Sequence, residues 1–73
     1  MSSDQIRQIQ LGLDTQRALL EETRTRLATV AENAHLLPVE MRQELHTQQA
    51  RNAEQLAELD HDCQLFTAWK ATR

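Results

Sequence analysis

Apolar residues recur along the first half of the chain at alternating spacings of three and four, as they do on one face of a coiled-coil helix. The repeating positions are Ile6, Ile9, Leu13, Gln16, Leu20, Thr23, Leu27, Val30, Ala34 and Leu37. Ser2 and Gln5 have the spacing of a capping box, and Met1 is placed to pack on Ile6 as a hydrophobic staple. The pattern predicts a first helix over about residues 3–33.

The helical pattern breaks before Pro38. Proline lacks a backbone N–H and its ring clashes with the preceding turn, so it ends a helix but suits the first position of a new one. Asn33 can adopt the left-handed conformation that closes a helix, and Glu40 suits a first turn. We expect a connection over about 33–37 and a second helix over about 38–70. The second helix repeats the pattern at Leu45, Gln49, Asn52, Leu56, Leu59, Cys63 and Phe66.

A connection this short predicts an all-α fold, an antiparallel, coiled-coil-like two-helix hairpin that spans residues 1–73 as a single domain. The two apolar rows then form its seam, and paired residues have numbers that sum to about 72. Thr23 lies beside Gln49, with Gln16 and Asn52 one layer away, so the seam has a polar waist. The waist is either packing open to water or a device that fixes register or partner choice. The alternative architecture is one long helix, kinked at its proline and dimerised as a coiled coil.

Composition narrows the function classes. The chain has 73 residues and a mass of 8.4 kDa, with one Gly, one Pro and two aromatic residues, Phe66 and Trp69. This composition argues against β structure and leaves little core to wall an enzyme pocket, so we expect no enzyme and no small-molecule substrate. The net charge of −3 disfavours nucleic acid and anionic membranes as partners. A single cysteine, with no signal peptide and no apolar run of bilayer length, predicts a cytoplasmic protein.

Two Glu-x-x-His sequences, Glu32 to His35 and Glu58 to His61, have the spacing of ligands in di-metal helical bundles. Their heptad positions point away from the seam, and in one hairpin the two pairs lie roughly 27 Å apart. Cys63 lies on the seam as a small apolar residue, without a second cysteine to share a zinc ion. We therefore expect no catalytic residue, no metal site and no cofactor.

Several apolar residues lie outside the seam or at its open end. A lone helix pair buries one narrow stripe, and chains of this size rarely stabilise themselves on so small a core. We expect the following residues to contact a partner: Leu11, Leu19, Met41, Leu65, Phe66 and Trp69. The partner is another protein or a second copy, which would complete a four-helix bundle. The alternative for Trp69 is that it folds over the end of its own seam.

Four acidic residues follow one another closely in the second helix: Glu54, Glu58, Asp60 and Asp62. A solvated helix face explains such a cluster. It also fits an acidic patch that steers a basic partner, since charge complementarity sets association rate and partner choice. The arginines form no single stripe and have no aromatic platform beside them, so RNA binding requires a surface assembled across a dimer.

In size and expected architecture the chain resembles several groups of small bacterial helical hairpins. These are the small subunit of the two-protein needle chaperones of type III secretion, immunity or antitoxin proteins, and the dimeric hairpin that modulates plasmid RNA pairing. The likeness rests on no diagnostic residue, and no functional residue is carried across. The apolar residues outside the seam favour a small non-enzymatic protein–protein interaction module, such as an adaptor, a chaperone subunit or an inhibitor. The alternative is a homodimeric four-helix bundle with a structural or RNA-binding role.

Overall fold

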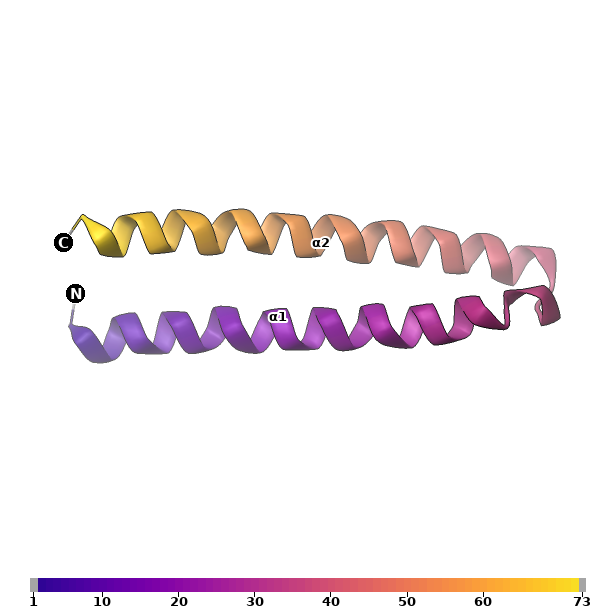
Figure 1. Ribbon diagram of the computed structural model, residues 1–73, viewed down its shortest axis with the longest axis horizontal. Helices are drawn as coiled ribbons and strands as arrows, with labels where there is room; N and C mark the ends of the chain where they lie inside the picture. The colour runs from indigo at the N-terminus through magenta and orange to yellow at the C-terminus, as the bar shows by residue number, and fades with distance from the viewer. Residues whose placement is uncertain (1, 73) are drawn as a thin grey trace.

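Two long antiparallel helices joined by a tight turn make up the computed structural model, which describes residues 2–72 (Figure 1). In chain order the elements are α1 (Ser3–Glu32), the 3₁₀ turn η1 (Ala34–Leu36) and α2 (Val39–Ala71). No strand occurs within the described residues. The expected antiparallel hairpin is confirmed, and a single kinked helix is excluded.

The first turn of α1 is closed by the expected capping box. The Ser2 N–H donates to Gln5 Oε1 at 2.9 Å, and the Gln5 N–H donates back to Ser2 Oγ at 3.3 Å. Two backbone donors that have no partner within the helix are thereby satisfied. The expected packing of Met1 on Ile6 lies outside the described residues.

The turn between the helices differs in detail from the expectation. Asn33 caps α1 with φ −111° and ψ 18°, so the expected left-handed conformation is wrong at this residue. The reason is that the chain continues into η1 in the same right-handed sense, with the Leu36 N–H donating to the Asn33 carbonyl at 3.0 Å. Pro38, with φ −56°, is the N-cap of α2 rather than its first residue, and its carbonyl accepts from the Arg42 N–H at 3.0 Å.

The seam of α2 is the one that the sequence pattern predicts. Leu45, Asn52 and Leu59 are its buried residues, and Leu59 is only 3% exposed. The remaining seam positions are half-buried: Gln49, Leu56, Cys63 and Phe66. The spacing of four and three therefore holds along the packed length of α2.

The seam of α1 departs from the prediction at every second position. Ile9, Gln16, Thr23 and Val30 are exposed, although the pattern places them between the helices. The half-buried residues of α1 are instead Ile6, Gln10, Leu13, Arg17, Leu20, Leu27 and Ala31. The helix α1 is thus rotated about its own axis relative to the prediction. This rotation places long polar side chains of α1 where they can reach α2. Gln10 accepts a hydrogen bond from Lys70, and Arg17 forms an ion pair with Asp60.

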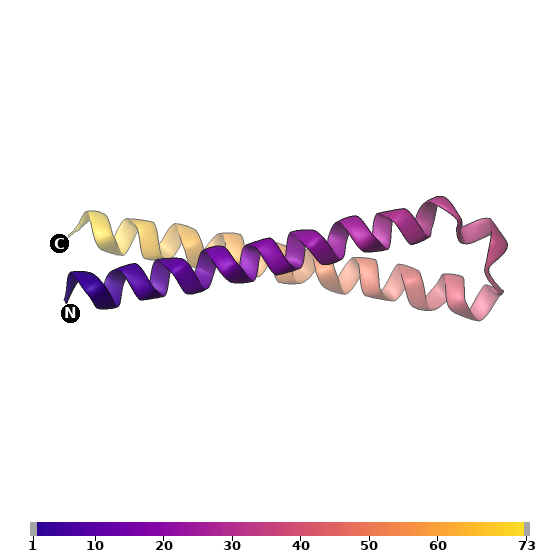
Figure 2. The ribbon, with the colours of Figure 1, turned by 90° about the horizontal axis from the view of Figure 1, so that it is seen from below.

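The hairpin is long and thin, with principal extents of 53 × 16 × 14 Å. Its radius of gyration is 16.6 Å, whereas a compact chain of this length is expected to have about 11 Å. The helices cross at a shallow angle near their middle (Figure 2). Only two hydrophobic side chains, Leu45 and Leu59, are buried between residues 2 and 72. The core of one chain is therefore very small.

Gly12 offers a direct test of how far helix propensity limits the stability of α1. A Cβ built on Gly12 meets no atom within 4 Å, so alanine fits without a clash. We expect Gly12→Ala to raise the free energy of unfolding by about 1 kcal/mol, measured by urea denaturation. The reverse change at an exposed position of the same helix, Ala18→Gly, should lower it by a similar amount. No gain from Gly12→Ala would show that α1 is not limited by its one glycine.

Candidate protein-binding surface

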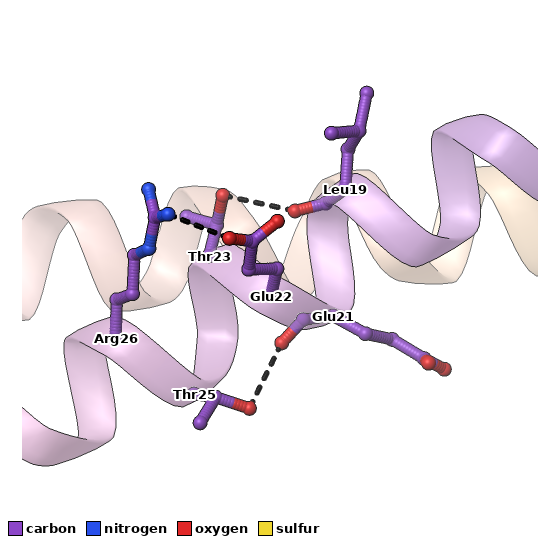
Figure 3. A network of polar contacts seen from close by, with 6 residues as sticks. All are labelled: Leu19, Glu21, Glu22, Thr23, Thr25 and Arg26. Atoms are coloured by element: carbon purple, nitrogen blue, oxygen red, sulfur yellow. Dashed lines mark hydrogen bonds and ion pairs between the residues drawn. The ribbon is translucent and has the colours of Figure 1, made fainter.

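Residues that flank the seam fall on two sides of the hairpin, since flanking positions of one helix lie beside the equivalent positions of an antiparallel neighbour. We call them the Leu11 side and the Leu19 side. The Leu19 side comprises Ile9, Leu19, Val30, Met41 and Leu65, which are all exposed. In Figure 3, Leu19 and Arg26 point to one edge of α1 and Thr25 to the opposite edge, with α2 behind.

On α1, the Leu19 side is the part of the apolar helix face that does not pack against α2. Ile9 and Val30 are 38% and 44% exposed, and Leu19 is 58% exposed. The seam with α2 therefore uses only one edge of that face. A helix with apolar residues at the seam and at one flanking position is typical of bundles, in which each helix contacts two neighbours.

Thr23 and Arg26, on the same edge of α1 as Leu19, are exposed but form polar contacts within the helix. The Thr23 hydroxyl donates to the Leu19 carbonyl oxygen at 3.1 Å (Figure 3). Arg26 Nη2 lies 2.6 Å from Glu22 Oε1 one turn earlier, which partly neutralises its charge. The polar hydrogen of Thr23 is thus used within α1.

The Leu11 side carries two shallow hollows near the open end. One, of about 440 Å³, lies along α2 and includes Arg17, Asp60 and Cys63. The other, of about 410 Å³, lies along α1 and includes Leu11 and Lys70. Residues of both helices line each hollow, so the two hollows mark the side of the seam opposite Leu19.

Arg17 and Asp60 form the ion pair that joins the helices on the Leu11 side, with Nη2 and Oδ1 2.5 Å apart. Hydrogen bonding of the guanidinium to Cys63, and then to Asp60, raises the pKa of Arg17 above its ordinary value. Arginine is charged at every physiological pH, so this shift has no regulatory effect. Both side chains are substantially exposed, and the pair orients the helices more than it stabilises them.

An aromatic cluster lies at the end of the hairpin opposite the turn, which we call the open end. Phe66 and Trp69 stack with ring centroids 5.6 Å apart and planes inclined by 20°. Lys70 Nζ lies 5.0 Å from the Phe66 ring centre and donates to Gln10 Oε1 at 3.0 Å. Both aromatic residues are half-buried, so each keeps some surface accessible to solvent.

The polar waist is built around Asn52, which is only 4% exposed. Its Nδ2 donates to the Leu20 carbonyl oxygen of α1 at 3.0 Å. The numbers of these two residues sum to 72, the expected pairing. No buried side-chain nitrogen or oxygen in the described part of the chain lacks a hydrogen bond, which fits a register device better than loose packing.

The residues expected to contact a partner do not form one patch. Leu11 is 65% exposed but lies on the opposite side from Leu19. Met41 lies at the turn end of α2, about 36 Å along the helix from Leu65. The structure adds Ile9 and Val30, which the sequence pattern assigns to the seam. The sequence did contain a signal for this: α1 has apolar residues at two neighbouring helical positions, so either of them could have formed the seam.

The acidic residues of α2 are likewise divided. Asp60 is engaged with Arg17 on the Leu11 side. Glu58 and Asp62 flank the seam on the Leu19 side, and Glu54 lies on the outer face of α2; all three are exposed. An incoming partner on the Leu19 side would therefore meet two of the four carboxylates.

The Glu-x-x-His residues lie where they cannot converge. All four are exposed: Glu32, His35, Glu58 and His61. No group of three or more His, Cys, Asp or Glu side chains in residues 2–72 could hold a metal ion. In the same range, no helix is both long enough and apolar enough to cross a bilayer.

Comparison of the chain with family models, with curated proteins and with solved structures gave no match.

Proposed function

We propose that this chain is a small non-enzymatic protein–protein interaction module that binds through the apolar Leu19 side of its hairpin. One observation carries the proposal. The apolar face of α1 is wider than its contact with α2, so Ile9, Leu19 and Val30 lie outside the seam. Exposed apolar residues at helical spacing beside a packed seam are typical of a helix that has a further neighbour.

The accessible surface of the chain supports a missing neighbour. The hairpin exposes 5730 Å², whereas a compact protein of 8.4 kDa is expected to expose about 4,600 Å². The excess of about 1,100 Å² exceeds the roughly 800 Å² that each partner buries in a standard interface. A partner on one side of the hairpin would remove an area of this size.

The proposed role is that of an adaptor, a chaperone subunit or an inhibitor in the cytoplasm. Leu19, Leu65 and the accessible surface of Trp69 would supply apolar contact area, and Glu58 and Asp62 would guide the encounter. Protein is favoured over RNA as the partner because the net charge is −3 and two arginines, Arg17 and Arg26, are engaged with carboxylates.

Site-specific photo-crosslinking in the native cells tests this proposal. A benzophenone amino acid in place of Gln16 lies on the Leu19 side, one turn from Leu19. The same probe in place of Thr15 lies on the outer face of α1 and is the matched control. We expect protein adducts from position 16 that are absent from position 15 and disappear with Leu19→Glu. Equal adducts from both positions, or none, would overturn the proposal.

A further inference from the structure

We propose that the occupant of the Leu19 side is a second copy of this chain, bound antiparallel in a two-fold symmetric four-helix bundle. This inference rests on the proposed function and names its partner. A two-fold symmetric interface requires one patch that is complementary to itself. The Leu19 side meets that requirement at most of its positions on both helices; the exception is Leu65, which comes level with Glu44 and the buried Leu45.

The α1 residues that lie on the Leu19 side of the hairpin are placed nearly symmetrically about Leu19. Ile9 lies ten residues before Leu19 and Val30 eleven residues after it. When two copies of α1 lie antiparallel, Ile9 of one faces Val30 of the other, and the two Leu19 side chains meet at the centre. Gln16 then faces Thr23, so polar residues also face polar residues.

Of the α2 residues that flank the seam on the same side, Met41 and Trp69 are placed symmetrically about Gln55. Met41 and Trp69 each lie fourteen residues from Gln55, one on either side. Antiparallel copies of α2 therefore place Met41 of one over the accessible surface of Trp69 of the other. In the same register Arg51 of one copy faces Glu58 of the other, so opposite charges are paired twice across the axis.

The centres of symmetry of α1 and α2 lie near one level of the hairpin. The hydrogen bond from Asn52 to Leu20 sets the level of α2 against α1. It places Gln55 within about one helical turn of Leu19 along the hairpin. A two-fold axis that runs across the hairpin at this level brings α1 onto α1 and α2 onto α2, each pair antiparallel. The two centres therefore differ by about 3 Å along the hairpin, and an axis midway between them offsets the facing residues of each helix pair by about 3 Å.

The symmetric bundle also explains the rotated seam of α1. Within one hairpin, burial of Ile9 and Val30 would remove more apolar surface than burial of Gln10 and Arg17. The structure leaves the apolar pair outside. In the bundle the seam residues and the Leu19 side both face the centre, so the whole apolar face of α1 is covered.

Disulfide trapping tests the register. In a Cys63→Ala background, Gln55→Cys places one thiol of each copy beside the axis, whereas Glu54→Cys, the next residue, places it on the outer face. With copper phenanthroline as oxidant, we expect the Gln55→Cys dimer to form at least roughly tenfold faster than the Glu54→Cys dimer. Equal rates would overturn the antiparallel register.

Sedimentation velocity tests the surface. Leu19→Glu brings two carboxylates together at the axis and should abolish the dimer. Leu11 is also exposed, 65% against 58% for Leu19, but lies on the other side, so Leu11→Glu should leave the dimer intact. Far-UV circular dichroism on the same samples checks that both variants remain helical. A helical, monomeric wild-type chain would overturn this inference. Adducts to a different protein from position 16 would then still support the proposed function.

Discussion

Leu59→Ala is expected to unfold most of the hairpin at room temperature. Leu59 is 3% exposed and is one of the two buried hydrophobic side chains in the described residues. Its truncation removes apolar burial and leaves a cavity, which together cost about 2–5 kcal/mol. A small domain often has little more than this to lose. The measurement is the free energy of unfolding in urea, followed by far-UV circular dichroism.

The matched control for Leu59 is Leu11→Ala. Leu11 is 65% exposed and lies outside the seam, so its truncation should change the unfolding free energy by no more than about 0.5 kcal/mol. If Leu59→Ala were as mild as Leu11→Ala, the packed seam of α2 would not be the source of stability.

Asn52→Asp, which replaces one NH2 group by an oxygen atom, is expected to lower the free energy of unfolding strongly. The aspartate cannot donate to the Leu20 carbonyl as the Asn52 amide does, and its charge is buried against that oxygen. Losing the donor and burying an unpaired charge should cost roughly 3 kcal/mol at neutral pH. Asn52→Leu removes the same hydrogen bond but adds no charge, so it should be at least as stable as the native chain.

The defect in Asn52→Asp should depend on pH in a defined direction. Burial raises the pKa of the new carboxyl above its unfolded value of about 3.9. Folding then takes up a proton, so the penalty is full above the folded pKa and shrinks as pH falls toward 4. Urea unfolding of both variants and the native chain across this range isolates the new group. A penalty that does not change with pH would mean that the site is open to water.

The helices could be predicted from sequence because their signals are local. The capping box at Ser2 and Gln5, the break at Pro38 and the apolar spacing in α2 each act within a few residues. The register of the waist also followed, since a short turn fixes which residues of two antiparallel helices are level. Asn52 and Leu20 meet at the expected level.

The rotation of α1 could not be predicted in the same way. Both candidate seams of α1 share Ile6, Leu13, Leu20 and Leu27, and they differ only at the alternate positions. The alternate positions of the observed seam make polar contacts with α2, because Arg17 reaches Asp60 and Lys70 reaches Gln10. Such contacts are tertiary and have no local signal. The candidate surface changed accordingly, since Ile9 and Val30 left the seam and joined Leu19.

The central claim is that one hairpin is incomplete and that a second copy covers its Leu19 side. Sedimentation equilibrium of the native chain over roughly 1–100 µM, with far-UV circular dichroism on the same samples, tests this claim most directly. We predict a helical species of twice 8.4 kDa that dissociates on dilution. A fully helical species of 8.4 kDa throughout, unfolding cooperatively and independently of concentration, would contradict the claim.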